Sequence, residues 1–168
     1  LLTDTQLLKQ CHDLIGVFSD CLKNGNKILV AGNGGSAADA QHFAGELVGR
    51  FKKERRGYPV IALTTATSVL TAWSNDYSFE TIFSRQVQAL GVPDDIFVGI
   101  STSGNSTNII EAVKEAQKNG VKTVGLLGKD GGTLKDMVEY PIVVPSEDTP
   151  RVQEVHITLI HAWCEQIE

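Results

Sequence analysis

Cysteine is scarce in this sequence, and its placement excludes two common architectures. The 168 residues contain three cysteines, Cys11, Cys21 and Cys164, which are widely spaced and form no Cys-x-x-Cys pair. A disulfide framework needs paired cysteines, and a zinc knuckle needs closely spaced ones. The pattern therefore predicts reduced structural thiols and a cytoplasmic protein.

Long apolar runs and an excess of positive charge are also missing. No stretch approaches the roughly 18 apolar residues of a membrane-spanning helix, so we expect a soluble protein with no membrane partner. The net charge is −5, whereas nucleic-acid-binding domains usually carry a basic face, so no nucleic-acid partner is expected. The one densely basic segment, residues 52–56, is typical of a solvated connection.

Repeats, low-complexity segments and linkers are absent too, which predicts a single domain over residues 1–168. The chain instead alternates helix-like and strand-like segments. Apolar residues recur at helical spacing over residues 3–23, and Asn24-Gly25-Asn26 supplies a stop signal. We expect this first helix in an oligomer interface. Short apolar runs typical of buried parallel strands occupy residues 27–31, 60–63, 96–100, 123–127 and 141–144.

Helical segments follow these strands, with a short one after the fourth and a terminal helix over residues 151–168. The alternation predicts an α/β fold, a doubly wound three-layer sandwich with a five-stranded parallel sheet and an additional amino-terminal helix. Ligands of such sheets bind beyond the carboxyl ends of the strands. The functional residues are therefore expected in the loops at that edge.

A glycine-rich loop follows the first predicted strand and opens a helix that runs to about residue 50. Residues 32–37 read Gly-Asn-Gly-Gly-Ser-Ala. Glycine lets backbone amides approach a ligand, and a helix N-terminus favours anionic or hydroxyl oxygens. The spelling fits a dinucleotide fingerprint, but Thr64 and Thr65 stand where its acidic residue should end the second strand. A bound ligand is favoured over a tight turn that only packs the helix on the sheet.

Hydroxyl side chains crowd the loop after the third predicted strand. Residues 101–107 read Ser-Thr-Ser-Gly-Asn-Ser-Thr and precede a helical segment. Hydroxyl donors, a glycine and the free amides of a helix start form a cradle for phosphate without a lysine. Helix capping explains one of the hydroxyls and leaves the others. Because the G-x-x-x-x-G-K-[ST] loop of nucleotide triphosphatases is missing, we predict a small phosphate ester as the ligand.

Acid–base side chains recur on two predicted helices. His42 and Glu46 share a face at i and i+4, a spacing that by itself is typical of a helix surface pair. On the terminal helix Gln153 and His161 also share a face, whereas His156 points elsewhere. A glutamate and a histidine from different elements can move a proton between adjacent carbons. Two imidazoles, a carboxylate and an amide also suit zinc.

Three blocks carry a family resemblance: GNGGSAADAQHFAGEL at residues 32–47, STSGNS at 101–106 and RVQEVHITLIHAWCEQIE at 151–168. Together with TSVLTAWSNDYSFE at 67–80, they closely resemble the bacterial phosphoheptose isomerases of the sugar isomerase (SIS) domain family. The resemblance implies interconversion of sedoheptulose 7-phosphate and D-glycero-D-manno-heptose 7-phosphate, a step towards the heptose units of lipopolysaccharide or capsule. It also implies a homotetramer with active sites at subunit interfaces.

The resemblance further assigns roles to single residues. It implies Glu46 as the catalytic base and His161 as its acid–base partner. One Zn²⁺ per subunit would be held by His42, Glu46, Gln153 and His161. Asn75 and Asp76 are expected before the third helix. The implied substrate contacts are Asn33, Gly34, Gly35, Glu46, Asn75, Asp76, Ser101, Thr102, Ser103, Ser106 and Gln153, with the four hydroxyl residues at the phosphate.

These roles describe an aldose–ketose isomerisation through a cis-enediolate. Glu46 would move the proton between C1 and C2, while His161 would protonate or deprotonate the hydroxyl and carbonyl oxygens. Two alternatives stay open from the sequence. A non-catalytic regulatory module of the same domain type can keep both loops while losing the carboxylate and the terminal-helix histidine, yet Glu46 and His161 are present here. An isomerase of another sugar phosphate would differ in pocket length.

Overall fold

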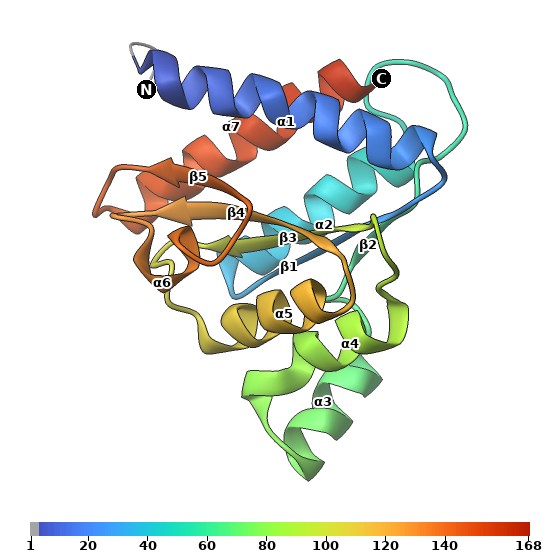
Figure 1. The fold of residues 1–168 in the computed structure, drawn as a ribbon, viewed down its shortest axis with the longest axis vertical. Helices are drawn as coiled ribbons and strands as arrows, with labels where there is room; N and C mark the ends of the chain where they lie inside the picture. The colour runs from blue at the N-terminus through green and yellow to red at the C-terminus, as the bar shows by residue number, and fades with distance from the viewer. Residues whose placement is uncertain (1–3) are drawn as a thin grey trace.

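Five strands form one sheet in the computed structural model, which describes residues 4–168 (Figure 1). They are β1 (Ile28–Gly32), β2 (Val60–Ala62), β3 (Ile96–Ser101), β4 (Lys122–Gly128) and β5 (Tyr140–Val144). The order is β2-β1-β3-β4-β5, and each pairing is parallel. The predicted five-stranded parallel sheet is confirmed. The chain reverses its direction of winding between β1 and β3, where sheets of this type bind their ligands.

Helices cover both faces of the sheet, which confirms the three-layer sandwich (Figure 1). On one face lie α1 (Thr5–Lys23), α2 (Gly35–Val48) and α7 (Thr149–Ile167). On the other lie α4 (Ile82–Leu90) and α5 (Thr107–Lys118), with α3 (Thr67–Asp76) beside α4. The short helices η1 (Phe79–Thr81) and α6 (Gly132–Lys135) precede α4 and follow β4. Within residues 4–168, no helix combines the length and apolar character needed to cross a membrane.

The first helix begins where its capping residue dictates. The predicted start at residue 3 lies outside the described residues, and α1 begins at Thr5. The carboxylate of Asp4 accepts hydrogen bonds from the backbone N–H groups of Gln6 and Leu7 at 3.1 and 3.0 Å. These amides have no acceptor inside the helix, so an aspartate at this position stabilises the first turn.

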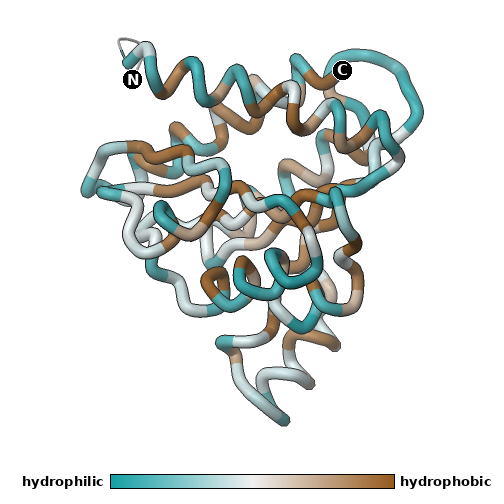
Figure 2. The backbone as a smooth tube through the Cα atoms, in the orientation of Figure 1, coloured by the Kyte–Doolittle hydropathy of each residue, from teal (hydrophilic) through white to brown (hydrophobic). Residues whose placement is uncertain are grey.

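Two hydrophobic clusters, one on each face, hold the layers together. Along β1, Ile28 and Val30 face α1, α2 and α7, whereas Leu29 and Ala31 face α4 and α5. This alternation follows from the twofold period of a strand, and burial of both faces explains the continuous apolar run. The apolar colouring of the central strands in Figure 2 reflects it.

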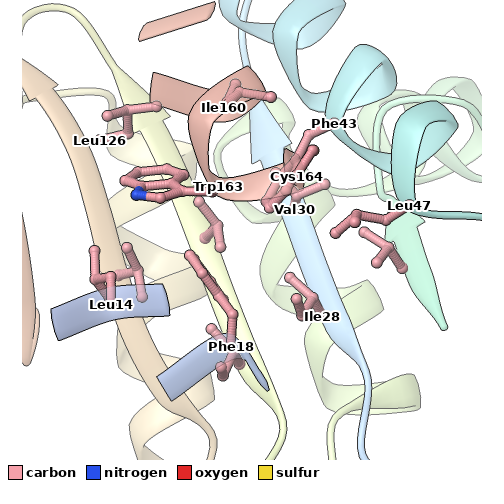
Figure 3. Packing of buried hydrophobic residues seen from close by; sticks show 14 of the residues in the cluster. Leu14, Phe18, Ile28, Val30, Phe43, Leu47, Leu126, Ile160, Trp163 and Cys164 are labelled. Atoms are coloured by element: carbon pink, nitrogen blue, oxygen red, sulfur yellow. The ribbon is translucent and has the colours of Figure 1, made fainter. Parts of the chain in front are cut away.

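Trp163 of α7 is the largest side chain of the first cluster and is 1% exposed. Figure 3 shows it among Leu14, Phe18 and Leu126. Its ring centroid lies 5.5 Å from that of Phe18. The indole N–H donates to the carbonyl of Cys11 at 3.1 Å, so the apolar packing leaves no unpaired donor on this side chain. These contacts join α7 to α1 through the core.

A buried carboxylate ties the amino end of the sheet. The Asp95 side chain is fully buried and accepts hydrogen bonds from Lys27 Nζ at 2.6 Å and from the Lys27 and Val92 amides at 3.0 and 2.9 Å. The side-chain amide of Asn26 donates to it at 3.2 Å. Burial raises the pKa of Asp95, but these donors outweigh burial and hold the pKa below its ordinary value.

Candidate active site

The glycine loop connects β1 to α2 in a conformation that requires glycine. Gly34 has a φ of +55° and is the N-cap of α2, a backbone region that other residues rarely adopt. A side chain at Gly35 would overlap the amide of Gln153 on α7. The side chain of Asn33 faces Asn108 of α5 at 2.8 Å. The loop therefore lies at the carboxyl end of β1, as predicted.

The hydroxyl loop at residues 101–106 lies beside it, at the carboxyl end of β3. Ser101 Oγ is 2.8 Å from Ser106 Oγ and 3.4 Å from Ser103 Oγ. Thr102 is half-buried in the same loop. Ser106 is the N-cap of α5 but makes no side-chain capping bond, and the first amides of a helix have no acceptor within it. Hydroxyls and amides that converge at a helix start suit a phosphate group.

Helix α6 braces this loop. Gly104 has a φ of +67°, and its carbonyl accepts a hydrogen bond from the Leu134 amide at 3.0 Å. The Asn105 side chain accepts from the amide and the hydroxyl of Thr133, both at 2.9 Å. A Cβ at Gly104 would overlap the carbonyl of Gly131. These contacts fix the conformation of the hydroxyl loop.

Helices α2 and α7 bring three predicted acid–base residues together. His42 Nε2 lies 2.9 Å from Glu46 Oε1, and His161 Nε2 lies 3.0 Å from His42 Nε2. One ligand atom from each of the three residues lies within 4.8 Å of the others. The side chain of His42 is 43% exposed and that of Glu46 is 25% exposed, so a ligand has access. Two imidazole nitrogens and a carboxylate oxygen are a donor set that zinc accepts.

A groove of about 330 Å³ lies between the same two helices. Gln153 lines it together with His42, and the side chain of Gln153 also lies against Gly35. Gln153 thus adjoins both the glycine loop and the groove, and its predicted role as a metal ligand stays a prediction. A larger hollow of about 560 Å³ adjoins Tyr58 and Pro59, but neither carboxylate nor imidazole is among its lining residues. Glu46 and His161 are not among the residues that line the groove, but His42 lines it and contacts both, so the groove is the better candidate for proton-transfer chemistry.

The basic segment at residues 52–56 is the exposed connection that we predicted, with Arg55 as the exception. The side chain of Arg55 is 12% exposed and pairs with Glu168 at 3.0 Å. Its guanidinium donates to the carbonyls of Glu46 and Leu47 at 3.0 and 2.8 Å, which fixes the last turn of α2. Local charge density gave no sign of this, because the carboxylate partner is 113 positions away in the sequence.

Phe51 also escaped the sequence analysis. Its ring stacks on the imidazole of His161, with centroids 5.6 Å apart and planes inclined at 28°. The backbone amide of Phe51 donates to Glu168 at 2.9 Å, as do those of Lys52 and Lys53 at 2.8 and 2.9 Å. Desolvation raises the pKa of Glu168, but these amides and Arg55 outweigh it and lower the pKa to about 2. The ionised carboxylate of Glu168 therefore fixes residues 51–53, and with them the Phe51 ring that stacks on His161.

We predicted that Asn75 and Asp76 precede the third helix. The structure instead places both in the last turn of α3. The helix begins at Thr67, so its ten residues end at this pair. Both side chains are exposed, and Asn75 Nδ2 donates to Asp76 Oδ1 at 2.8 Å. Helix α3 lies on the opposite face of the sheet from α2 (Figure 1). The single chain therefore does not join these two residues to Glu46.

As predicted, His156 does not share the face of Gln153 and His161, and it packs in the interior instead. It is fully buried, and its Nε2 lies 3.0 Å from the carbonyl of Leu127. Burial lowers the pKa of His156 to about 4, against a smaller opposing effect of the Leu127 carbonyl. The imidazole is therefore neutral near pH 7 and bonded to the sheet, away from the groove.

Comparison with known proteins gives a consistent result. The profile of the SIS domain family matches residues 3–128. The phosphoheptose isomerase of Geotalea daltonii is 61% identical over 155 residues, which cover 92% of this chain and 81% of that protein. The solved phosphoheptose isomerase of Neisseria gonorrhoeae has a TM-score of 0.91 at 48% identity, covering 96% of this chain and 86% of its own. That of Francisella tularensis has a TM-score of 0.92 at 41% identity, covering 95% and 85%.

Proposed function

The chain belongs to the phosphoheptose isomerases of the SIS domain family, and we propose that Glu46 and His161 carry out its reaction. That reaction interconverts sedoheptulose 7-phosphate and D-glycero-D-manno-heptose 7-phosphate. One observation carries the residue assignment: His42, Glu46 and His161 converge, although His42 and His161 are 119 positions apart in the sequence. The presence of both Glu46 and His161 also favours an enzyme over a non-catalytic regulatory module.

The substrate phosphate is held by the hydroxyl loop. The hydroxyls of Ser101, Ser103 and Ser106 and the first amides of α5 receive its oxygens. Thr102 completes the loop, and the glycine loop at residues 33–35 contacts the sugar. Anchoring the phosphate immobilises the reacting carbons, and this removes much of the entropic part of the barrier.

Proton transfer takes place at Glu46. Its carboxylate abstracts the proton from one of C1 and C2 and returns it to the other, through a cis-enediolate. The side-chain hydrogen bond of Glu46 described in residues 4–168 uses Oε1, which leaves Oε2 to accept the proton. His161 donates a proton to the carbonyl oxygen and removes one from the neighbouring hydroxyl. Phe51, stacked on the imidazole, fixes the plane of the His161 ring.

A zinc ion fits the same side chains. His42, Glu46 and His161 supply three ligands, and Gln153, which lines the groove beside His42, is the proposed fourth. Bound zinc would polarise the substrate oxygens as a Lewis acid. Glu46 and Gln153 would then contact both the metal and the substrate.

Zinc content gives a test that does not depend on activity. We expect the purified protein to hold about one Zn²⁺ per chain, and His42→Ala to lose most of it, because fewer than three strong ligands bind zinc weakly. Elemental analysis after dialysis against zinc measures this. His12→Ala, at an exposed histidine on α1, should keep the parent content. Equal zinc in both variants would contradict the proposed ligand set.

Turnover of sedoheptulose 7-phosphate tests the function itself. We expect the purified protein to form the aldoheptose phosphate, and a chelator to lower the rate until zinc is restored. Product formation is followed by chromatography or NMR. Turnover that is insensitive to chelation would remove zinc from the mechanism and keep the enzyme. Faster turnover of an arabinose or hexose phosphate would instead favour another sugar-phosphate isomerase.

We further propose a cytoplasmic homotetramer with active sites at subunit interfaces. Helix α3 and η1 leave Val69, Tyr77 and Phe79 between 41% and 69% exposed, and Leu8 of α1 is 45% exposed, which suits contact with other copies. An interface site would also account for Asn75 and Asp76 on the far side of the sheet from α2. The three cysteines are buried and unpaired, as in a reducing compartment. The heptose product would serve lipopolysaccharide or capsule synthesis.

A further inference from the structure

A reciprocal pair of amides joins the glycine loop to the first turn of α5, which directly follows the hydroxyl loop. Asn33 Nδ2 donates to Asn108 Oδ1, and Asn108 Nδ2 donates to Asn33 Oδ1, each at 2.8 Å. The two residues are 75 positions apart in the sequence. Asn108 lies in the first turn of α5 and is 3% exposed. Within residues 4–168, no other side-chain hydrogen bond connects the glycine loop to α5 or to the hydroxyl loop.

The Asn33–Asn108 pair lies beyond the last paired residues of β1 and β3. The last register partners of β1 and β3 at this edge are Gly32 with Ile100, so beyond them no strand pairing holds the two loops against each other. Gly34, with a φ of +55°, adds a residue with few steric restraints. A buried amide that loses its partner is destabilised. Each asparagine therefore keeps the other in place.

We propose that Asn108 is a positioning residue that sets the glycine loop against the hydroxyl loop, so that one sugar phosphate engages both at once. Asn108 acts through Asn33 and needs no contact with the substrate. The inference rests on the proposed function, in which one loop holds the sugar and the other holds the phosphate. Its physical basis is preorganisation: a loop already placed loses less conformational entropy when the ligand binds.

Asn108→Ala separates this role from a merely structural one, because two ligands need different parts of the site. Inorganic phosphate needs only the hydroxyl loop, whereas sedoheptulose 7-phosphate needs both loops. We expect kcat/KM for the sugar phosphate to fall about tenfold, mainly through KM, which is of the size expected when both hydrogen bonds of the pair are lost. The inhibition constant of inorganic phosphate should stay within about twofold of the parent value.

Further variants sharpen the test. Asn119→Ala makes the same change at the other end of α5, where the side chain lies 3.5 Å from the carbonyl of Val87, and should keep the parent kinetics. Adding Asn108→Ala to Asn33→Ala should cause no additional loss if the two residues act as a pair. Asn108→Asp keeps the shape and one of the two hydrogen bonds, and it replaces the alanine variant if that protein folds poorly.

Three results would overturn the proposal. Parallel losses of phosphate inhibition and turnover would mean that Asn108 only maintains the hydroxyl loop. Unchanged kcat/KM would mean that the pair is dispensable. Absence of phosphate inhibition in the parent would mean that the hydroxyl loop does not bind phosphate on its own, which the proposal requires. Turnover of sedoheptulose 7-phosphate by the parent tests the proposed function separately, so the two failures can be told apart.

Discussion

Glu46→Gln should lose kcat by roughly 10²–10⁴-fold, the usual contribution of a positioned general base. The amide keeps the shape of the side chain but cannot accept a proton from carbon. Because Glu46 contacts only His42 through a side-chain hydrogen bond in the described residues, the fold should be unaffected. Steady-state kinetics with sedoheptulose 7-phosphate measure the change, and KM should move by only a few fold.

Glu111→Gln is the matched control for this variant. Glu111 lies on α5 and pairs with Lys114 at 2.7 Å on the surface, so its replacement should leave kcat unchanged. Thermal unfolding of both variants shows whether either change disturbs the fold. Turnover of Glu46→Gln close to that of the parent would refute the assignment of Glu46 as the base.

Asp95→Asn should produce the largest loss of stability among the substitutions considered, at about 3 kcal/mol. The amide removes the charge that pairs with Lys27 and turns an N–H group towards buried donors. For a domain of this size we expect Tm to fall by roughly 6–12 °C. Calorimetry or denaturant unfolding at pH 7 measures it, with Asp13→Asn, at an exposed position on α1, as the control.

The effect should also depend on pH with a defined sign. The folded pKa of Asp95 lies below its ordinary value, so the unfolded chain binds more protons than the folded one in acid. The carboxylate therefore stabilises the fold above its ordinary pKa of 3.8, and this contribution is lost as the pH falls from there through the folded pKa. The stability difference between parent and Asp95→Asn should accordingly shrink in acid. A difference that stays constant down to pH 3 would contradict this account.

Hydrophobic patterning was enough to predict the architecture. The short apolar runs became β1 to β5 because a strand buried on both faces must be apolar throughout. The helical spacing of His42 and Glu46 placed both on one face, where the structure has them in contact. Their meeting with His161 depends on how α2 packs on α7, which no local pattern specifies.

Other features of the site were beyond sequence reasoning because their partners are remote. In the sequence Arg55 is one of several cations in a loop. In the structure it pairs with Glu168 and donates to the carbonyls at the end of α2. Nothing in the local sequence distinguishes Asn108 at the start of a helix, because its partner Asn33 lies in the loop after β1, 75 positions away. Asn75 and Asp76 were placed before a helix, whereas α3 begins earlier and ends with them.

Helix α7 carries His161 on one side and the buried Trp163 two residues further on. A displacement of this helix that widened the groove would also have to pull the indole away from Phe18 and from the carbonyl of Cys11. Close packing of Trp163 in the core therefore also restricts movement of the His161 imidazole. A ligand beside His161 therefore contacts a helix that the core holds in place, so opening of the site requires movement of segments other than α7.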